Sequence, residues 1–148
     1  MIILIGIVVI IVGLLCWVGQ GLGVFALPVA VRLGFAEPED EVDQSLYLIE
    51  RWAQGIMDVL LTWILPLSGL LMILHNTYWP VFALVGGGIY LYFPGVFMTS
   101  RIVLKKHGRK VGSPSSVTAA YILGTIWIAS ATTMVVLAVI ELKSGTIG

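Results

Sequence analysis

The chain has 148 residues, of which 59% are hydrophobic and 11% are charged, and its mean hydropathy is +1.04. A soluble domain is about 45–50% apolar and about 25% charged, so this composition excludes an ordinary soluble globule. Eight Lys and Arg residues balance eight Asp and Glu residues, which leaves no net basic field to attract nucleic acid. We expect one membrane domain over residues 1–148. Because a single cysteine, Cys16, cannot form an internal disulfide, packing has to hold this domain together.

Four segments are long and apolar enough to cross a bilayer. A helical span needs about 20 apolar residues, whereas barrel strands have about 10 residues that alternate in polarity. The continuous runs predict an all-α integral membrane protein, a small bundle of four transmembrane helices at residues 2–31, 52–74, 79–100 and 117–142. The first run is about twice as long as a signal-peptide core and no Lys or Arg precedes it, so we expect it to be retained.

Small residues in the first span predict close helix contacts. Gly6 and Gly13 are seven residues apart on one side of the helix, and Gly19 and Gly23 form a Gly-xxx-Gly pair. The same packing is expected of small residues in two other spans, which are Gly86, Gly87 and Gly88 in the third span and Ala120 and Gly124 in the fourth. These faces serve either the bundle itself or association with another copy or a larger subunit.

The connector at residues 32–51 contains an acidic run and then an amphipathic segment. Five carboxylates occur between Glu37 and Asp43, without the spacing or the turn glycine of an EF-hand loop. Residues 44–54 have apolar side chains at helical spacing, which predicts a short interfacial helix before the second span, capped by Asp43. We expect the acidic run to be solvated, to face a partner, or to pair with the basic loop at residues 101–116.

Asp58 is the only charged residue that this pattern places well inside a span. Thr62 lies one turn further on, and Pro66 frees a backbone carbonyl near Thr62 because proline lacks an N–H. A carboxylate beside a free carbonyl is a candidate site for a cation or a proton. The alternative is structural: Asp58 is protonated, or it bonds to a hydroxyl group or to Arg51 and locks two helices together.

The turn after the second span contains the polar residues His75, Asn76 and Tyr78. We expect an interfacial position for them, because a membrane haem usually needs a second axial ligand at matching depth and the other histidine, His107, lies at the opposite face. No catalytic triad, paired carboxylates, phosphate loop or zinc motif occurs in the chain. We therefore expect no catalytic residue, no metal and no cofactor.

The basic residues predict the orientation. Cytoplasmic loops of membrane proteins carry an excess of Lys and Arg. The two long loops, with Arg32 and Arg51 at the ends of the first, contain seven of the eight basic residues, and only Lys143 is on the other side. We expect both termini outside, in the cytoplasmic membrane of a bacterium. The cations of the second loop would set topology or bind lipid headgroups: Arg101, Lys105, Lys106, Arg109 and Lys110.

Three functions are compatible with these features. The first hypothesis is an accessory or assembly subunit without catalysis of its own. Its partners would be membrane lipid and either further copies of itself or a larger membrane complex, and we expect no binding of nucleic acid. The second is a small ion or proton transporter or channel protomer that uses Asp58. The third is a membrane haem or metal protein that uses His75. Span number by itself transfers no function.

Overall fold

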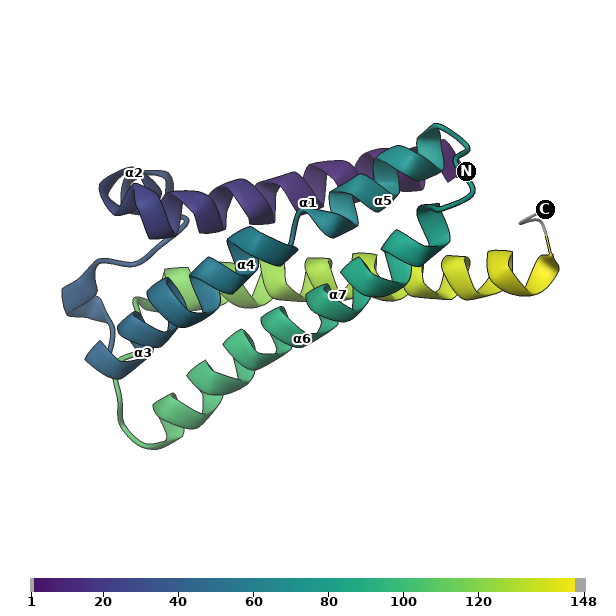
Figure 1. The fold of residues 1–148 in the computed structure, drawn as a ribbon. Helices are drawn as coiled ribbons and strands as arrows, with labels where there is room; N and C mark the ends of the chain where they lie inside the picture. The colour runs from purple at the N-terminus through teal and green to yellow at the C-terminus, as the bar shows by residue number, and fades with distance from the viewer. Residues whose placement is uncertain (1, 146–148) are drawn as a thin grey trace.

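The fold is built from four long apolar helices that run back and forth (Figure 1). The computed structural model describes residues 2–145, so residues 1 and 146–148 of the predicted domain lie outside it. The spans are α1 (Ile2–Phe25), a composite helix from Gln44 to Ile73, α6 (Trp79–Lys106) and α7 (Pro114–Ser144). Each is long and apolar enough to cross a membrane, which confirms the all-helical class and the number of spans among the described residues.

The first span is shorter than the apolar run that encodes it. The chain leaves helical geometry at Ala26, and α2 (Leu27–Leu33) then begins with Pro28 in its first turn, where a missing N–H costs nothing. Gly34 ends α2 in the left-handed conformation, with φ of +77°, which glycine adopts without steric cost. The apolar run at residues 2–31 therefore forms two helices, and a 3₁₀ turn, η1 (Glu39–Glu41), follows.

The amphipathic segment is helical, but it continues directly into the second span. Helix α3 (Gln44–Leu48) passes through a π-helical turn, η2 (Ile49–Gln54), into α4 (Gly55–Leu61), and α5 (Ile64–Ile73) follows a break at Thr62. The N-cap prediction is confirmed, because the carboxylate of Asp43 accepts a hydrogen bond from the Ser45 N–H at 3.0 Å. The second span thus begins eight residues earlier than its hydropathy indicates, and polar residues of η2 belong to it.

The half of the bundle nearer the termini has a tight apolar core. Helix α6 packs along α7 and α5, and α1 packs along α5. A methyl group on Gly86 would lie 2.7 Å from the Leu65 backbone nitrogen, and one on Gly13 would lie 2.7 Å from the Pro66 ring. Gly6, Gly87 and Gly124 are equally confined, Gly19 faces the Phe35 ring, and only Gly23 and Gly88 of the expected packing glycines have open space around them.

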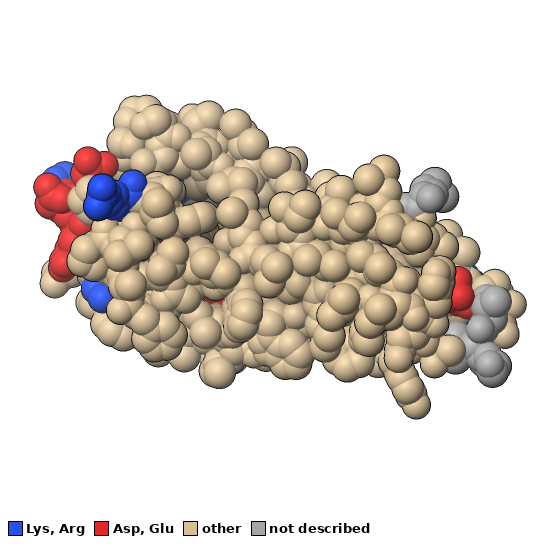
Figure 2. Space-filling model, turned by 90° about the horizontal axis from the view of Figure 1, so that it is seen from above, with Lys and Arg blue, Asp and Glu red and all other residues tan. Residues whose placement is uncertain are grey.

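The two long loops are bonded to each other at the other end of the bundle. Val42 and Val111 form a β-bridge, and the Asp43 N–H donates to the Lys110 carbonyl at 2.9 Å. The guanidinium of Arg109 lies 2.8 Å from the Asp43 carboxylate, which confirms the expected pairing of the acidic and basic loops. Figure 2 shows most of the visible charged side chains gathered at this end, with a largely uncharged surface between the two ends.

Candidate functional site

The half of the bundle nearer the loops contains a cavity of about 400 Å³. All four spans line it: α1 contributes small residues, α6 aromatic residues, α7 serine and alanine, and the composite second span contributes most of the polar groups. The connector after α2 covers the outer part, where Phe35 and Glu37 face inward. The cavity therefore extends from the charged end of the molecule into the membrane-spanning region.

The polar wall is a stripe along the second span. Glu50, Gln54, Asp58 and Thr62 occur at intervals of four residues and all line the cavity. In an α-helix such positions drift by about 40° at each step, because 3.6 residues complete a turn. The π-helical turn has more residues per turn and offsets part of this drift. The sequence prediction found only Asp58 and Thr62, although the interval of four was already visible from Glu50 onward.

Asp58 lies deep in the cavity without a partner for its carboxylate. The residue is 6% exposed, and its Oδ1 has no hydrogen bond to any residue between 2 and 145. Neither the hydroxyl of Thr62 nor the predicted partner Arg51 bonds to this carboxylate. The Thr62 hydroxyl donates to the Asp58 backbone carbonyl at 2.6 Å, and Arg51 donates to the Tyr47 hydroxyl and stacks on the Trp52 ring at 4.7 Å.

Hydrogen bonds to backbone carbonyls close the inner end of the cavity. The Tyr90 hydroxyl lies 3.0 Å from the Thr62 carbonyl oxygen and 3.1 Å from that of Gly13, so it bridges the second span and α1. The Thr62 carbonyl is the one that Pro66 leaves free, as predicted, but Tyr90 occupies it. The Trp127 indole of α7 donates to the Val12 carbonyl at 3.1 Å. We call these five bonded residues of four spans, with Tyr90 at the centre, the seal: Val12, Gly13, Thr62, Tyr90 and Trp127.

A buried ion cluster lies near the mouth. Arg101 is 1% exposed; its Nη2 lies 3.1 and 3.2 Å from the two carboxylate oxygens of Glu37, and its Nη1 donates to Glu50. Its guanidinium also stacks on the Phe97 ring at 3.9 Å. The expectation that Arg101 faces lipid headgroups is therefore wrong, because α6 extends beyond residue 100 and turns Arg101 toward the bundle. The other four basic residues of that loop are exposed: Lys105, Lys106, Arg109 and Lys110.

The polar turn at the opposite end has a separate environment. His75, Asn76 and Tyr78 are exposed, and the Asn76 side chain accepts the Tyr78 N–H at 2.9 Å. His75 is the one non-glycine residue between 2 and 145 with a positive φ, of 53°, and it follows Leu74, the C-cap of α5. Within that same range no group of three or more His, Cys, Asp and Glu residues is arranged to hold a metal ion.

The chain matches no protein-family model, no characterised protein and no solved structure. The chemistry of the cavity is therefore the basis for a functional argument. Four carboxylates line the cavity but only two guanidinium groups, so its formal charge is negative; the carboxylates belong to Glu37, Glu41, Glu50 and Asp58, and the guanidinium groups to Arg51 and Arg101. Such a cavity attracts cations from the charged end and presents one unpaired carboxylate at its base.

Proposed function

We propose that this chain is a small ion or proton transporter or channel protomer that binds its cationic ligand at Asp58. The observation that carries the proposal is the buried carboxylate with an unpartnered oxygen at the base of the cavity. A charged residue at mid-membrane costs at least about 2.5–3.5 kcal/mol on insertion scales and marks ion and proton pathways. The absence of a protein partner for Asp58 within residues 2–145 favours this function over a structural lock.

The geometry favours a carrier over an open pore. The seal around Tyr90 lies at the inner end of the cavity, where the lining meets the apolar core. Access from the other end requires the Tyr90 hydroxyl to leave its two carbonyl acceptors. The break at Thr62, between α4 and α5, is the position at which the second span can change angle for this step.

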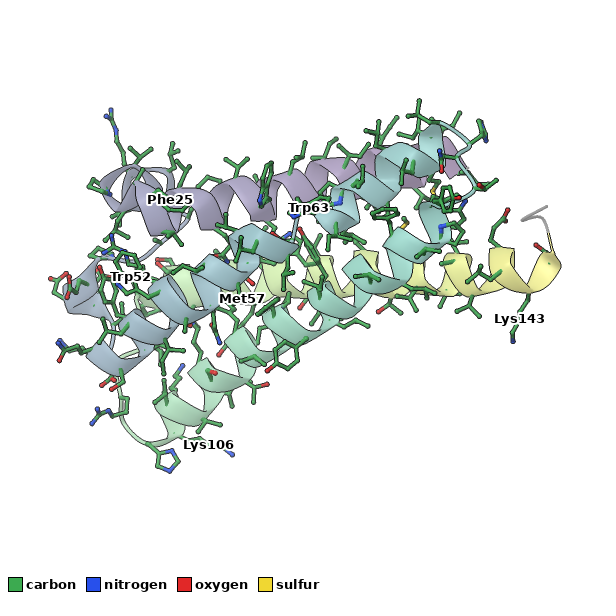
Figure 3. All side chains as sticks on the ribbon, viewed as in Figure 1. Phe25, Trp52, Met57, Trp63, Lys106 and Lys143 are labelled. Carbon is green, nitrogen blue, oxygen red and sulfur yellow. The ribbon has the colours of Figure 1, made fainter. Side chains whose placement is uncertain are left out.

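The orientation follows from the charges. Lys106 and Lys143 lie at opposite ends of the bundle (Figure 3), and the end with Lys106 holds seven of the eight basic residues. The positive-inside rule therefore supports a cavity that opens to the cytoplasm, with both termini outside and the first turns of the composite helix at the interface. We infer the cytoplasmic membrane of a bacterium as the location.

The test is flux in sealed vesicles. Purified protein is reconstituted in liposomes, and a proton, sodium or potassium gradient is imposed. Uptake of that ion is followed with an entrapped dye that responds to it. Asp58→Asn should reduce the ion flux to the level of empty liposomes. The matched control is Glu39→Gln, because Glu39 is an exposed carboxylate outside the cavity lining. Background flux of all three ions in the wild type, or equal flux in Asp58→Asn, refutes transport of these inorganic ions at Asp58.

The hypothesis of an accessory subunit stays a prediction. It depends on glycine faces and an acidic loop that are free for a partner, whereas most of those glycines contact other spans and the acidic loop is bonded to residues 109–112. Gentle extraction from the native membrane, followed by mass identification of co-purifying proteins, tests it. The haem hypothesis also stays a prediction, and a Soret band that His75→Ala removes would support it.

A further inference from the structure

We propose that the ligand of this cavity is an organic monocation, a protonated amine or quaternary ammonium group, with Asp58 as its counter-ion. This inference rests on the proposed function and names the class of its ligand. Three properties of the cavity support it: the size, the small number of available oxygen atoms, and the aromatic wall.

The size fits an organic molecule. The cavity volume of about 400 Å³ lies within the range of about 300–1,000 Å³ that is typical of small-molecule sites. A single water molecule takes up about 30 Å³ in the liquid, and a bare metal ion needs no more room than its ligand shell. Most of the space around Asp58 would remain unused by a bare ion.

The base of the cavity has few oxygen atoms for a dehydrated metal ion: apart from Asp58, the free side-chain oxygen atoms near this depth are those of the amides Gln20 and Gln54. Hard cations such as Ca²⁺ take about six to eight oxygen ligands. The Thr62 hydroxyl donates to a backbone carbonyl, and the Thr62 carbonyl accepts from Tyr90, so neither is free. Asp58 is left as the available anion at this depth. One carboxylate is enough for an ammonium group, which carries a single charge and needs little further coordination.

The wall opposite the polar stripe is aromatic. Tyr90, Phe93 and Phe97 follow each other at intervals of three and four on the face of α6 that lines the cavity. Tyr90 contacts Thr62 at the seal, and the two helices run antiparallel. At 1.5 Å per residue, Phe93 lies about 4.5 Å from Tyr90 along α6 and Asp58 about 6 Å from Thr62 along the second span, so the two lie at a similar depth.

Aromatic faces attract cations, most strongly where water is excluded. The same wall already holds one, because the Arg101 guanidinium lies 3.9 Å from the Phe97 ring. Other aromatic side chains of the lining complete an enclosure that suits a cation with an apolar surface; they are Phe35, Tyr47 and Trp127. An unpaired carboxylate facing such rings is the arrangement that recognises organic ammonium groups.

The experiment compares a charged probe with its uncharged isostere. Benzyltrimethylammonium and neopentylbenzene have nearly the same shape and differ in charge. Each is titrated calorimetrically into the detergent-solubilised full-length protein, with empty micelles as the blank. We expect saturable binding of the ammonium probe and at least about 30-fold weaker binding of the isostere, because only the former compensates the carboxylate. Choline chloride, which is itself a quaternary ammonium salt, should compete with the ammonium probe. Sodium chloride at equal ionic strength should not compete.

Variants locate the site. Asp58→Asn should weaken binding of the ammonium probe by about 30-fold or more, and Phe93→Leu, which retains apolar volume but removes the ring, by about two- to five-fold. Glu39→Gln should leave it unchanged. Equal binding of probe and isostere, or undiminished binding in Asp58→Asn, overturns the inference. If Asp58→Asn fails to fold, the comparison of the two probes in the wild-type protein decides alone.

The outcomes also separate this inference from the proposed function. Proton, sodium or potassium flux that depends on Asp58, without saturable binding of the ammonium probe, refutes the organic ligand and leaves the proposed function standing. Ammonium binding at Asp58 without such flux supports the ligand class and contradicts transport of those inorganic ions.

Discussion

Replacement of Arg101 by methionine should be among the most destabilising changes at the charged end of the bundle. The substitution keeps the length and apolar stem of the side chain but leaves the carboxylates of Glu37 and Glu50 close together without their counter-ion. Removal of one partner from a fully buried ion pair costs about 3–5 kcal/mol. Because the two glutamate side chains retain 14% and 18% exposure, water offsets part of the loss, and we expect about 3 kcal/mol.

The assay is equilibrium unfolding by sodium dodecyl sulfate in mixed micelles, followed by helical circular dichroism. The matched control is Arg109→Met at the same end, where the arginine is 55% exposed and pairs with Asp43. An exposed pair of this kind contributes about 0–1 kcal/mol. The two arginine variants should therefore differ by about 2 kcal/mol or more.

A rescue variant tests the physical cause. If the loss comes from uncompensated charge, Glu37→Gln and Glu50→Gln should restore most of the stability that Arg101→Met removes, since uncharged groups need no counter-ion. Replacement of a whole buried ion cluster by neutral side chains is often nearly neutral, within about 1 kcal/mol. Equal losses for the two arginine variants, or a triple variant that is no more stable than Arg101→Met, would refute the reasoning.

Three further predictions concern the packing, the seal and the loops. Gly86→Ala should destabilise the bundle by about 1–3 kcal/mol, because the new methyl group meets the Leu65 backbone at 2.7 Å, whereas Gly88→Ala, which points into open space, should be neutral or stabilise by up to about 1 kcal/mol; equal effects in the unfolding assay would contradict this. Tyr90→Phe should cost about 1 kcal/mol and raise passive proton leak in liposomes, and an unchanged leak rate would show that the hydroxyl is not part of a seal. Desolvation raises the pKa of Asp43, but the Ser45 N–H and the Arg109 guanidinium outweigh it and hold this pKa below its ordinary value of about 3.9. A lowered pKa in the folded chain stabilises the fold at pH values above the ordinary pKa, and this stabilisation is lost as the pH falls through the lowered pKa. Asp43→Asn should therefore be less stable than the wild type at pH 7 and equally stable in strong acid. A stability difference that does not change with pH would exclude this cause.

Hydropathy predicted the spans well and the site only in part. Each apolar run became a helix because a chain in lipid has to satisfy its backbone hydrogen bonds within the segment. Asp58, Thr62 and the carbonyl freed by Pro66 were recognisable because a polar group inside an apolar run is costly. Glu50 and Arg101 were assigned to loops, since charge near the end of a span also suits an interface. Their burial depends on the extension of two helices beyond the apolar runs.

The amino-acid sequence by itself determined the solvent, the number of spans and the concentration of basic residues at one end, because these depend on local composition and on the free energy of transfer into lipid. Only the tertiary structure decided that four spans leave a cavity, that Tyr90 closes its inner end, and that Arg101 compensates Glu37 and Glu50 rather than Asp58. These features require residues more than 25 positions apart to meet at one depth. That meeting is set by the register of antiparallel helices and by one π-helical turn, and neither is a property of any single segment.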